Sequence, residues 1–153
     1  MTEIVIRRCR RGDLRAHAWG PYRDALPMIA RVFELAERGT MVMLVATTGN
    51  RHVGQSWLDL ARYRTGAVLW ALRVKPAWRG RGIGTRLIAA AEQTARRAGR
   101  AWLEIEVELG NTRARELYER LGYSWLHRRW ASDALTGAPL TFELDILRRP
   151  LAA

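Results

Sequence analysis

The segment from residue 74 to residue 86 constrains the fold of this chain more than any other part of its sequence. It reads Val-Lys-Pro-Ala-Trp-Arg-Gly-Arg-Gly-Ile-Gly-Thr-Arg, and it joins a predicted strand to a predicted helix. Pro76 ends the strand because proline cannot donate to a strand ladder. A glycine-rich turn followed by the unpaired N–H groups of a helix start makes a binding site for phosphate-like anions. The sequence therefore predicts an anion-binding loop at this junction.

The spacing of the glycines separates this loop from two common nucleotide-binding loops. Gly80, Gly82 and Gly84 follow a G-x-G-x-G pattern, and Arg79 and Arg81 flank them with positive charge. A dinucleotide-binding fold has G-x-G-x-x-G after an early strand, whereas this loop lies in the middle of the chain. A Walker loop needs Gly-Lys-Ser or Gly-Lys-Thr, which is absent. A plain strand–helix turn does not require three glycines between arginines.

Hydropathy patterns place regular elements on both sides of the loop. The expected strands span residues 3–8, 41–46, 52–62, 67–74, 102–109, 123–130 and 140–147. The expected helices span residues 14–19 after Asp13 as a cap, 23–38, 82–97, and a segment that Asn111 caps and Gly122 ends. The order β-α-α-β-β-β-α-β-α-β-β predicts an α+β fold with a mixed, mostly antiparallel sheet and helices on both faces. We expect a single domain over residues 3–148.

The composition of the chain limits the kinds of covalent bond, metal site and location that it can have. Cys9 is the one cysteine, which excludes an internal disulfide, and His17, His52 and His127 show no metal-ligand spacing. We therefore expect no metal. No apolar run reaches the roughly 18 residues of a membrane helix, and the first residues lack the apolar stretch of a secretory signal. The cytoplasm is the expected location.

Positive charge is the unusual feature of the composition. The chain has 26 Lys plus Arg against 15 Asp plus Glu, and only Lys75 is a lysine. A phosphorylated cofactor would use a few arginines, and we assign Arg79 and Arg81 to it. A nucleic-acid partner would require a clustered basic patch or a recognition helix, and neither is evident, so we do not expect one. An arginine-rich composition with most of these side chains on solvated faces explains the remainder.

Two ordered motifs resemble the GCN5-related N-acetyltransferases, the GNAT family. The first is Val74-Lys75-Pro76 followed by Arg79-Gly80-Arg81-Gly82-Ile83-Gly84. The second is Asn111, Ala114 and Leu117-Tyr118-Glu119-Arg120-Leu121-Gly122-Tyr123, which is similar to the family pattern Asn…Ala…Leu-Tyr-Glu-x-Leu-Gly-Phe. One helix and one strand separate the motifs, as in the family. The resemblance covers nearly the whole chain.

The resemblance implies an acetyl-CoA site and its residues. In the family, the strand before the loop carries a bulge and splays from its parallel neighbour, and pantetheine lies between the two strands. The cofactor-binding residues implied here are Leu72, Arg73, Val74, Arg79, Gly80, Arg81, Gly82, Ile83, Gly84, Thr85, Asn111 and Tyr118. One N–H group of residues 72–74 would polarise the thioester carbonyl. Asn111 could also serve only as a helix cap.

The resemblance also implies an acid for the leaving thiolate, at Tyr118, although a core tyrosine is the alternative on this apolar stripe. Many relatives carry a general base as a Glu on the strand before the loop, and this chain has none there. Glu104 and Glu106 on the next strand, and Asp59, are the candidate bases, with a solvated strand face or a water relay as alternatives. Direct transfer from acyl-CoA needs no nucleophilic residue.

The expected function is transfer of an acetyl group from acetyl-CoA to a primary amine of a small molecule or protein. A non-catalytic acyl-CoA sensor of the same fold is the alternative, because the strand Glu is missing. Near candidates for the acceptor pocket are Trp19, Tyr22, Arg23, Trp57, Trp125 and Trp130. The sequence leaves open the amine, the acyl-chain preference and the oligomeric state, although the two C-terminal strands could pair across the axis of a homodimer.

Overall fold

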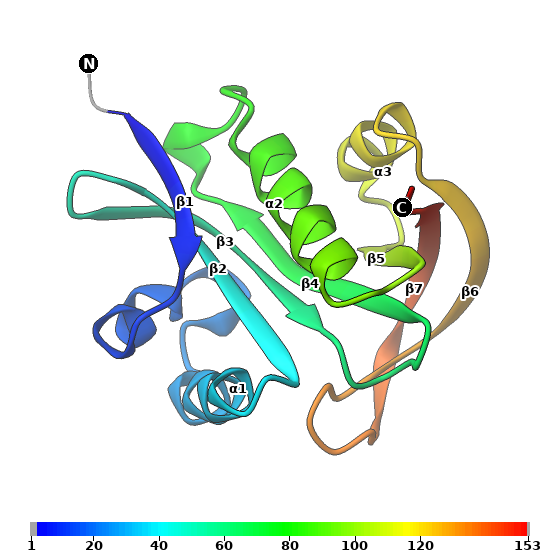
Figure 1. The fold of residues 1–153 in the computed structure, drawn as a ribbon, viewed down its shortest axis with the longest axis horizontal. Helices are drawn as coiled ribbons and strands as arrows, with labels where there is room; N and C mark the ends of the chain where they lie inside the picture. Colours follow the sequence, from blue (N-terminus) through cyan, green and yellow to red (C-terminus); the bar gives the residue numbers. More distant parts are fainter. Residues whose placement is uncertain (1–2, 153) are drawn as a thin grey trace.

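A seven-stranded sheet in the order β1-β2-β3-β4-β5-β7-β6 forms the centre of the computed structural model, which describes residues 3–152 (Figure 1). The strands are β1 (Ile4–Arg8), β2 (Met41–Thr48), β3 (Arg51–Asp59), β4 (Gly66–Val74), β5 (Trp102–Glu108), β6 (Ser124–Ser132) and β7 (Pro139–Pro150). The α-helices are α1 (Leu26–Glu37), α2 (Ile83–Arg97) and α3 (Thr112–Arg120). Within residues 3–152, none of the helices has the length and apolarity needed to cross a membrane.

Strand pairing in this sheet is antiparallel except at one place. The neighbours β1–β2, β2–β3, β3–β4, β5–β7 and β6–β7 pair antiparallel, and β4–β5 pair parallel. A short crossover cannot join parallel strands, so the chain passes through α2 between β4 and β5. The predicted α+β class with a mixed, mostly antiparallel sheet is confirmed.

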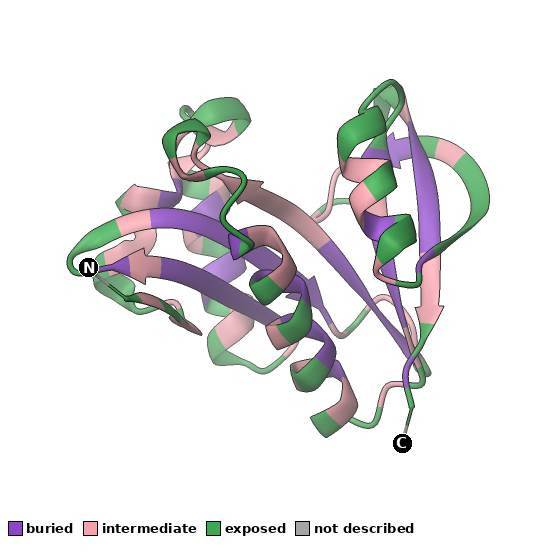
Figure 2. Ribbon diagram, turned by 90° about the horizontal axis from the view of Figure 1, so that it is seen from above, coloured by how far each residue is buried: buried purple, intermediate pink, exposed green. Residues whose placement is uncertain are grey.

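Helices cover both faces of the sheet, and the alternation along β2 shows how the sequence specifies this arrangement. Met41 and Met43 face α1 and pack with its buried residues around Trp57. Val42 and Leu44 face the opposite way, into the larger core beneath α2 and α3. Figure 2 shows buried residues along the central strands and exposed residues on the outer sides of the helices. A period of two along the strand thus serves two cores.

The N-terminal connection differs from the sequence prediction. Residues 14–19 do not form an α-helix; the chain instead makes two 3-10 helices, η1 (Arg11–His17) and η2 (Gly20–Tyr22). Asp13 is not the residue before the helix but its third, where its carboxylate accepts from the Arg10 N–H at 2.6 Å and pairs with Arg7. The physical reason is length, since Gly12 and Gly20-Pro21 leave too few residues to sustain an α-helix.

The next helix also begins later than predicted. It begins at Leu26 rather than at residue 23, with Pro27 in its first turn, where a missing N–H costs nothing. The remaining helices and strands lie within three residues of their predicted limits. The exact limits are set by tertiary pairing, for example where β7 continues to Pro150 along β5.

Strands β4 and β5 diverge after a short parallel contact. They pair between residues 66–69 of β4 and residues 102–105 of β5, and not beyond. On the other side of β4, the register against β3 shifts between Gln55 and Trp57. Ala71 takes a φ of 54°, the only positive value among the non-glycine residues described. A residue in this conformation bends the strand away from its neighbour, as a β-bulge does. The two strands therefore form a V that opens toward the Gly-rich loop.

Candidate active site

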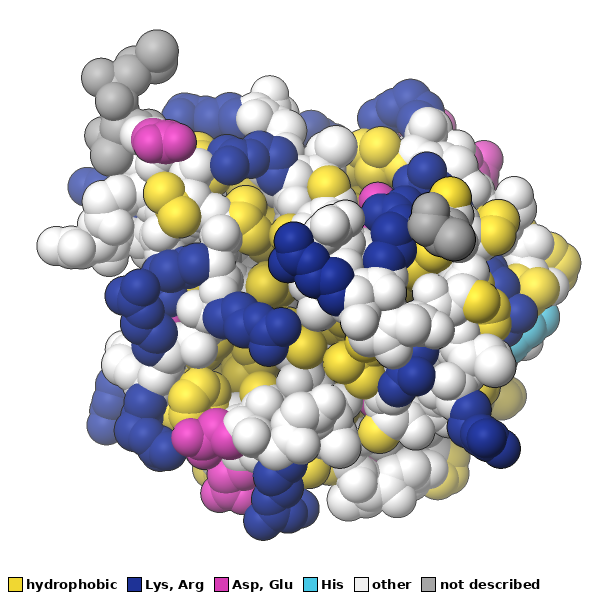
Figure 3. All heavy atoms as spheres, viewed as in Figure 1, with side chains coloured by type: hydrophobic (Ala, Val, Ile, Leu, Met, Phe, Trp, Pro, Cys, Tyr) yellow, Lys and Arg dark blue, Asp and Glu magenta, His cyan; other side chains and the backbone are white. Residues whose placement is uncertain are grey.

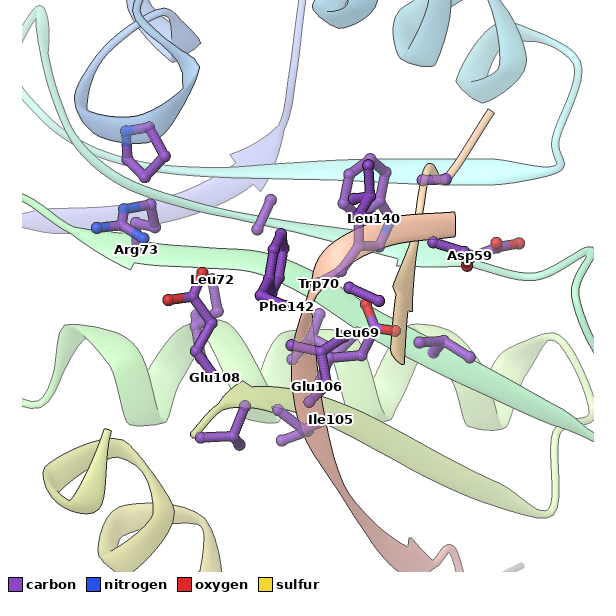
Figure 4. Close-up of a pocket in the computed structure, with 18 of the residues that line it drawn as sticks. Asp59, Leu69, Trp70, Leu72, Arg73, Ile105, Glu106, Glu108, Leu140 and Phe142 are labelled. Atoms are coloured by element: carbon purple, nitrogen blue, oxygen red, sulfur yellow. The ribbon is translucent and has the colours of Figure 1, made fainter. Parts of the chain in front are cut away.

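A cavity of about 500 Å³ occupies the V between β4 and β5 (Figure 4). Its walls come from β4 and β5, the start of α3, the β6–β7 hairpin, η2 and the end of β3. The lining includes Tyr22, Asp59, Trp70, Leu72, Arg73, Glu106, Glu108, Asn111, Tyr118, Leu140 and Phe142. Elements from both halves of the chain therefore contribute to one site.

The Gly-rich loop leads into α2 and leaves a run of backbone donors unpaired. Gly80 and Gly82 both have a φ of 77°, and a Cβ built on either would meet no atom within 4 Å. Within residues 3–152, no acceptor receives the N–H groups of residues 80–85, whereas the Arg86 N–H donates to Gly82. These N–H groups, with the positive end of the α2 dipole, form a site suited to an anion.

The two arginines of the loop contact residues just before it in the chain. The Arg79 Nε donates to the Val74 carbonyl at 3.1 Å, which closes the turn. The Arg81 guanidinium lies 4.6 Å from the centre of the Trp78 ring. Around this face of the molecule, arginine side chains are distributed among neutral and apolar atoms rather than gathered in one patch (Figure 3).

The loop adjoins the cavity through the first turn of α2. A Cβ on Gly84 would lie 3.9 Å from both Leu117 on α3 and Val74 at the end of β4. Of the sequence-predicted cofactor residues, Leu72, Arg73, Asn111 and Tyr118 line the cavity. The others lie outside this lining, at the end of β4, in the loop that follows it and in the first turn of α2; they are Val74, Arg79, Gly80, Arg81, Gly82, Ile83, Gly84 and Thr85. The predicted set is thus divided between the cavity and the adjoining loop.

Asn111 has the capping role that its position predicts. Its Oδ1 accepts from the Ala114 N–H at 3.2 Å, so the side chain begins α3. Asn111 also lines the cavity. Capping and ligand contact are therefore compatible at this residue.

Tyr118 lies on the buried side of α3, where it belongs to the larger core and also lines the cavity. Only 6% of the residue is exposed. Burial raises the pKa of Tyr118 to about 12, and the nearby Arg73 cation opposes that rise. No hydrogen bond joins its hydroxyl to another of residues 3–152, so a protonated phenol is free to donate into the cavity.

Glu104 and Glu106 have different surroundings although they lie on the same face of β5. Glu104 is 1% exposed, does not line the cavity, and accepts from the Arg148 Nη2 at 2.5 Å. Glu106 does line the cavity, and its Oε2 accepts from Arg62 at 3.3 Å and from Arg129. The other oxygen of Glu106 makes no hydrogen bond within residues 3–152. Neither residue lies on the open, solvated strand face that alternation suggests.

An aromatic cluster supports the part of the cavity wall that Tyr22 and Trp70 form. Trp57 is fully buried, and its ring contacts Tyr22 and Trp70 at centroid distances of 5.1 and 4.8 Å. Its Nε1 donates to the Nδ1 of His17 at 3.1 Å. Burial lowers the pKa of His17 to about 3, which keeps this imidazole neutral as an acceptor.

Several residues of the cavity were missed by sequence reasoning. Of the six acceptor-side candidates, only Tyr22 lines the cavity; Trp57 lies behind it, and Trp125 and Trp130 are exposed on β6. Trp70, Leu140, Phe142 and Glu108 were not predicted. Trp70 sits in an apolar strand and reads as core, and Phe142 is brought to the site only by the pairing of β7 with β5. The alternation along β5 was the one available signal for Glu108.

Comparison with known proteins places the chain in a family. The profile of the acetyltransferase (GNAT) family matches residues 8–123. That match covers most of the chain, so the protein belongs to the GNAT acetyltransferase family. Mycothiol acetyltransferase of Gordonia bronchialis is 31% identical over 121 residues, which are 79% of this chain and 37% of that protein. The chain spans about a third of the length of the curated relatives it matches.

Solved structures share the fold over nearly the full chain. The ribosomal-protein-alanine N-acetyltransferase of Brucella melitensis superposes with a TM-score of 0.78 at 22% identity, covering 96% of this chain and 99% of that one. A GNAT family acetyltransferase of Elizabethkingia anophelis with acetyl-CoA bound superposes with a TM-score of 0.71 at 16% identity, covering 97% and 98%. At these identities the likeness shows a common fold.

Proposed function

We propose that the chain is an N-acetyltransferase that moves an acetyl group from acetyl-CoA to a primary amine. One observation carries the proposal. The unpaired N–H groups of residues 80–85 adjoin a V-shaped cavity whose lining includes Tyr118. These groups suit the parts of acetyl-CoA. The N–H groups of the loop can donate to a pyrophosphate, and the unpaired edge of β4 can hydrogen-bond to the amides of pantetheine.

Backbone groups supply most of the contacts to the donor in this proposal. The N–H groups of residues 80–85 hold the pyrophosphate. Successive N–H groups of a strand point to opposite sides, and the Lys75 N–H donates to Val53 on β3, so those of Leu72 and Val74 are the ones available to the gap beside β5. Bound acetyl-CoA supplies an activated acetyl thioester, which an amine attacks directly so that a C–N bond forms as the C–S bond breaks. One N–H group beside the bulge at Ala71 stabilises the negative charge that develops on the carbonyl oxygen.

Tyr118 assists the departure of the thiolate. The pKa of an ordinary thiol is about 8.5, well below the value of about 12 for Tyr118. Complete proton transfer from the phenol is therefore unfavourable, and Tyr118 acts chiefly as a hydrogen-bond donor to sulfur, with the proton restored from solvent. Asn111 caps α3 and so fixes where this helix begins, which in turn sets the position of Tyr118 beside the cavity.

Glu106 is the proposed acceptor of the amine proton. It lines the cavity with one carboxylate oxygen unpaired, whereas Glu104 is buried against Arg148 outside it. Arg62 and Arg129 hold the other oxygen of Glu106 and so fix its orientation. Glu106 on β5 would thus serve as the general base in place of the glutamate that β4 lacks. A candidate base in the cavity favours an enzyme over a non-catalytic sensor.

The direct test combines acetyl-CoA binding with turnover. Acetyl-CoA should raise the melting temperature of the protein, and a panel of primary amines should release free thiol from it. If the melting temperature does not change at saturating acetyl-CoA, the proposal is wrong. Binding without turnover of any amine would instead favour the sensor. One similar protein is named a mycothiol acetyltransferase and another a ribosomal-protein-alanine N-acetyltransferase, so the names of the similar proteins do not agree on one acceptor.

Substitution of Tyr118 tests its assigned role at the thiolate separately. Tyr118→Phe removes only the hydroxyl, so kcat should fall about 10- to 100-fold, the usual effect of a lost hydrogen bond to a charged group, with acetyl-CoA affinity unchanged. Tyr123→Phe is the matched control, because Tyr123 is 2% exposed and donates to Glu92 at 3.1 Å away from the cavity. That variant should lose stability and keep kcat. An undiminished kcat in Tyr118→Phe would make Tyr118 a core residue.

A further inference from the structure

The charged side chains of the cavity are mostly engaged within the protein. They are Asp59, Arg62, Arg73, Glu106, Glu108 and Asp133. The Asp59 carboxylate accepts from two backbone N–H groups at 2.9 and 3.1 Å, and Asp133 accepts from two at 2.9 Å. Arg62 and Glu106 pair with each other. Four of the six charges therefore have partners before any ligand binds.

Arg73 and Glu108 are the two charged side chains of the cavity without a partner among the described residues. Within residues 3–152, neither side chain makes a hydrogen bond or an ion pair, although both line the cavity. Arg73 comes from β4 just after the bulge, and Glu108 ends β5 on the other arm of the V. In Figure 4 the carboxylate of Glu108 points across the cavity toward the side from which Arg73 projects. Opposite charges thus face each other across the cavity, more than 4 Å apart.

The Arg73 side chain is held on its wall by uncharged groups. Its guanidinium lies 6.0 Å from the ring centre of Trp19, whose Nε1 donates to Gln55 at 2.9 Å. A Cβ on Gly20 would lie 3.5 Å from the Arg73 Nε, so the chain of η2 closes over it. A guanidinium that is ordered but unpaired beside a cavity is a ready site for an anionic oxygen.

The space beside this charge pair has apolar walls. Tyr22, Trp70, Leu140 and Phe142 line it, and Leu140 and Phe142 are 39% and 43% exposed. Large apolar side chains left open to solvent within a cavity gain most from covering by an apolar ligand group. A ligand that satisfies the cavity therefore combines an ammonium, an anionic group and an apolar body.

We infer that the acceptor is a zwitterionic amine with a large apolar side chain, the chemistry of an apolar α-amino acid. Glu108 binds the ammonium before the amine loses its proton, Arg73 binds the carboxylate, and Tyr22, Trp70 and Phe142 cover the side chain. A polyamine fits poorly, because the lining offers one unpaired carboxylate and one unpaired cation. This inference rests on the acetyltransferase function proposed above and names the substrate class of the same site.

Three probes separate the contributions of the two charges. L-phenylalanine carries ammonium, carboxylate and ring; L-phenylalaninamide lacks the negative charge; 2-phenylethylamine lacks the carboxyl group altogether. With acetyl-CoA saturating, thiol release gives kcat/KM for each, corrected for the fraction of each amine that is unprotonated. L-phenylalanine should exceed both other probes by about 10- to 100-fold, the usual effect of a hydrogen bond to a charged group.

Two variants assign the preference to its residues. Arg73→Gln should remove the advantage of L-phenylalanine, mainly through KM, and should lower kcat/KM for the two probes without a carboxylate much less. Glu108→Gln should weaken all three probes alike, because each carries the ammonium. Arg97→Gln is the matched control, since Arg97 is an exposed arginine near the end of α2, away from the cavity, and it should change nothing.

The outcomes distinguish this inference from the proposed function. Equal kcat/KM for the three probes overturns the inference and leaves the acetyltransferase intact. An equal loss for all probes in Arg73→Gln also overturns it, and assigns Arg73 to the acetyl donor. If none of the probes is acetylated, calorimetric titration into the CoA-loaded protein decides: tighter binding of L-phenylalanine than of its amide, abolished by Arg73→Gln, supports the zwitterion site, and equal or no binding overturns it.

Discussion

The two ends of the site are built by different means. At the loop after β4, the protein presents backbone N–H groups of residues 80–85, and the side chains of Arg79 and Arg81 turn to Val74 and Trp78. At the other end, around Tyr22, Trp70 and Glu106, it presents side chains from strands and turns far apart in the sequence. A backbone site recognises a group common to many ligands, whereas a side-chain site distinguishes one ligand from another.

This difference explains why one fold can serve many acceptors. Backbone donors depend on φ and on the helix start, so most substitutions at the loop arginines leave the donors in place. The acceptor side changes with each side chain that lines it. The donor end is therefore expected to tolerate side-chain variation and to be sensitive to glycine substitution, and the acceptor end to behave in the opposite way.

The largest effect should come from Glu106, the proposed proton acceptor on β5. Glu106→Gln should lower kcat about 100-fold, the lower range for loss of a general base. Steady-state kinetics measures this fall. If Glu106→Gln retains kcat, another group accepts the amine proton. Glu108 is then the next candidate, and Glu108→Gln should show the fall in kcat.

Glu104→Gln is the matched change two residues away. Glu104 is buried against Arg148, so the substitution leaves that cation without its partner. Breaking a fully buried pair costs about 3–5 kcal/mol, and the cost here should be smaller because the Arg148 side chain is 34% exposed. Denaturant unfolding should show this loss while kcat of the folded enzyme is unchanged. A large fall in kcat would place Glu104 in the reaction.

The donor end is tested by two glycines on one helix. Gly82 and Gly99 precede and follow α2, have φ values of 77° and 76°, and would each accept a Cβ without meeting an atom within 4 Å. Alanine at either position should cost about 1–2 kcal/mol of stability, because the left-handed conformation disfavours a Cβ. Only Gly82→Ala should also weaken acetyl-CoA binding, by about tenfold or more, since its methyl group stands among the donor N–H groups.

Binding calorimetry with acetyl-CoA compares the two variants directly. Equal affinity in Gly82→Ala and Gly99→Ala, at similar losses of stability, would mean that the loop does not approach the ligand closely. Loss of affinity in both would point to a general effect of α2 stability rather than to the anion site.

The same contrast sets how much the sequence could predict. The loop, the Asn111 cap and the alternation of β5 are local patterns, and each predicts its structure because the interactions lie within a few residues. The side-chain role of Arg73 and the walls from Trp70 and Phe142 depend on the bulge at Ala71 and on β7 pairing beside β5. Neither has a local signal. The sequence also did not predict that residues 14–19 lack an α-helix. The apolar residues of this segment pack against β2 and α1, and these tertiary contacts do not require helical spacing.

The smallest effect concerns His17 and Trp57 behind the acceptor end of the site, and how the stability of the protein depends on pH through His17. His17 is buried, accepts from Trp57, and has a pKa of about 3, whereas an unfolded histidine titrates near 6.5. The unfolded chain therefore binds the proton first, so stability is complete above about pH 6.5 and is lost as pH falls. The contribution of His17 to this slope should approach about 1.4 kcal/mol per pH unit. His52, whose pKa is also lowered by burial, adds to the slope in the same direction.

His17→Gln should flatten this slope, because an amide oxygen can accept from Trp57 and does not titrate in this range. His127→Gln is the control, since His127 is exposed on β6, and it should leave the slope unchanged. Denaturant unfolding between pH 7 and pH 5 measures the difference. Acetyl-CoA affinity at pH 5.5 should be the same in the wild type and in His17→Gln to within about twofold, because distant sites behave independently. A parallel change in that affinity would show that the two ends of the site are coupled, and would break the distinction between a backbone end and a side-chain end.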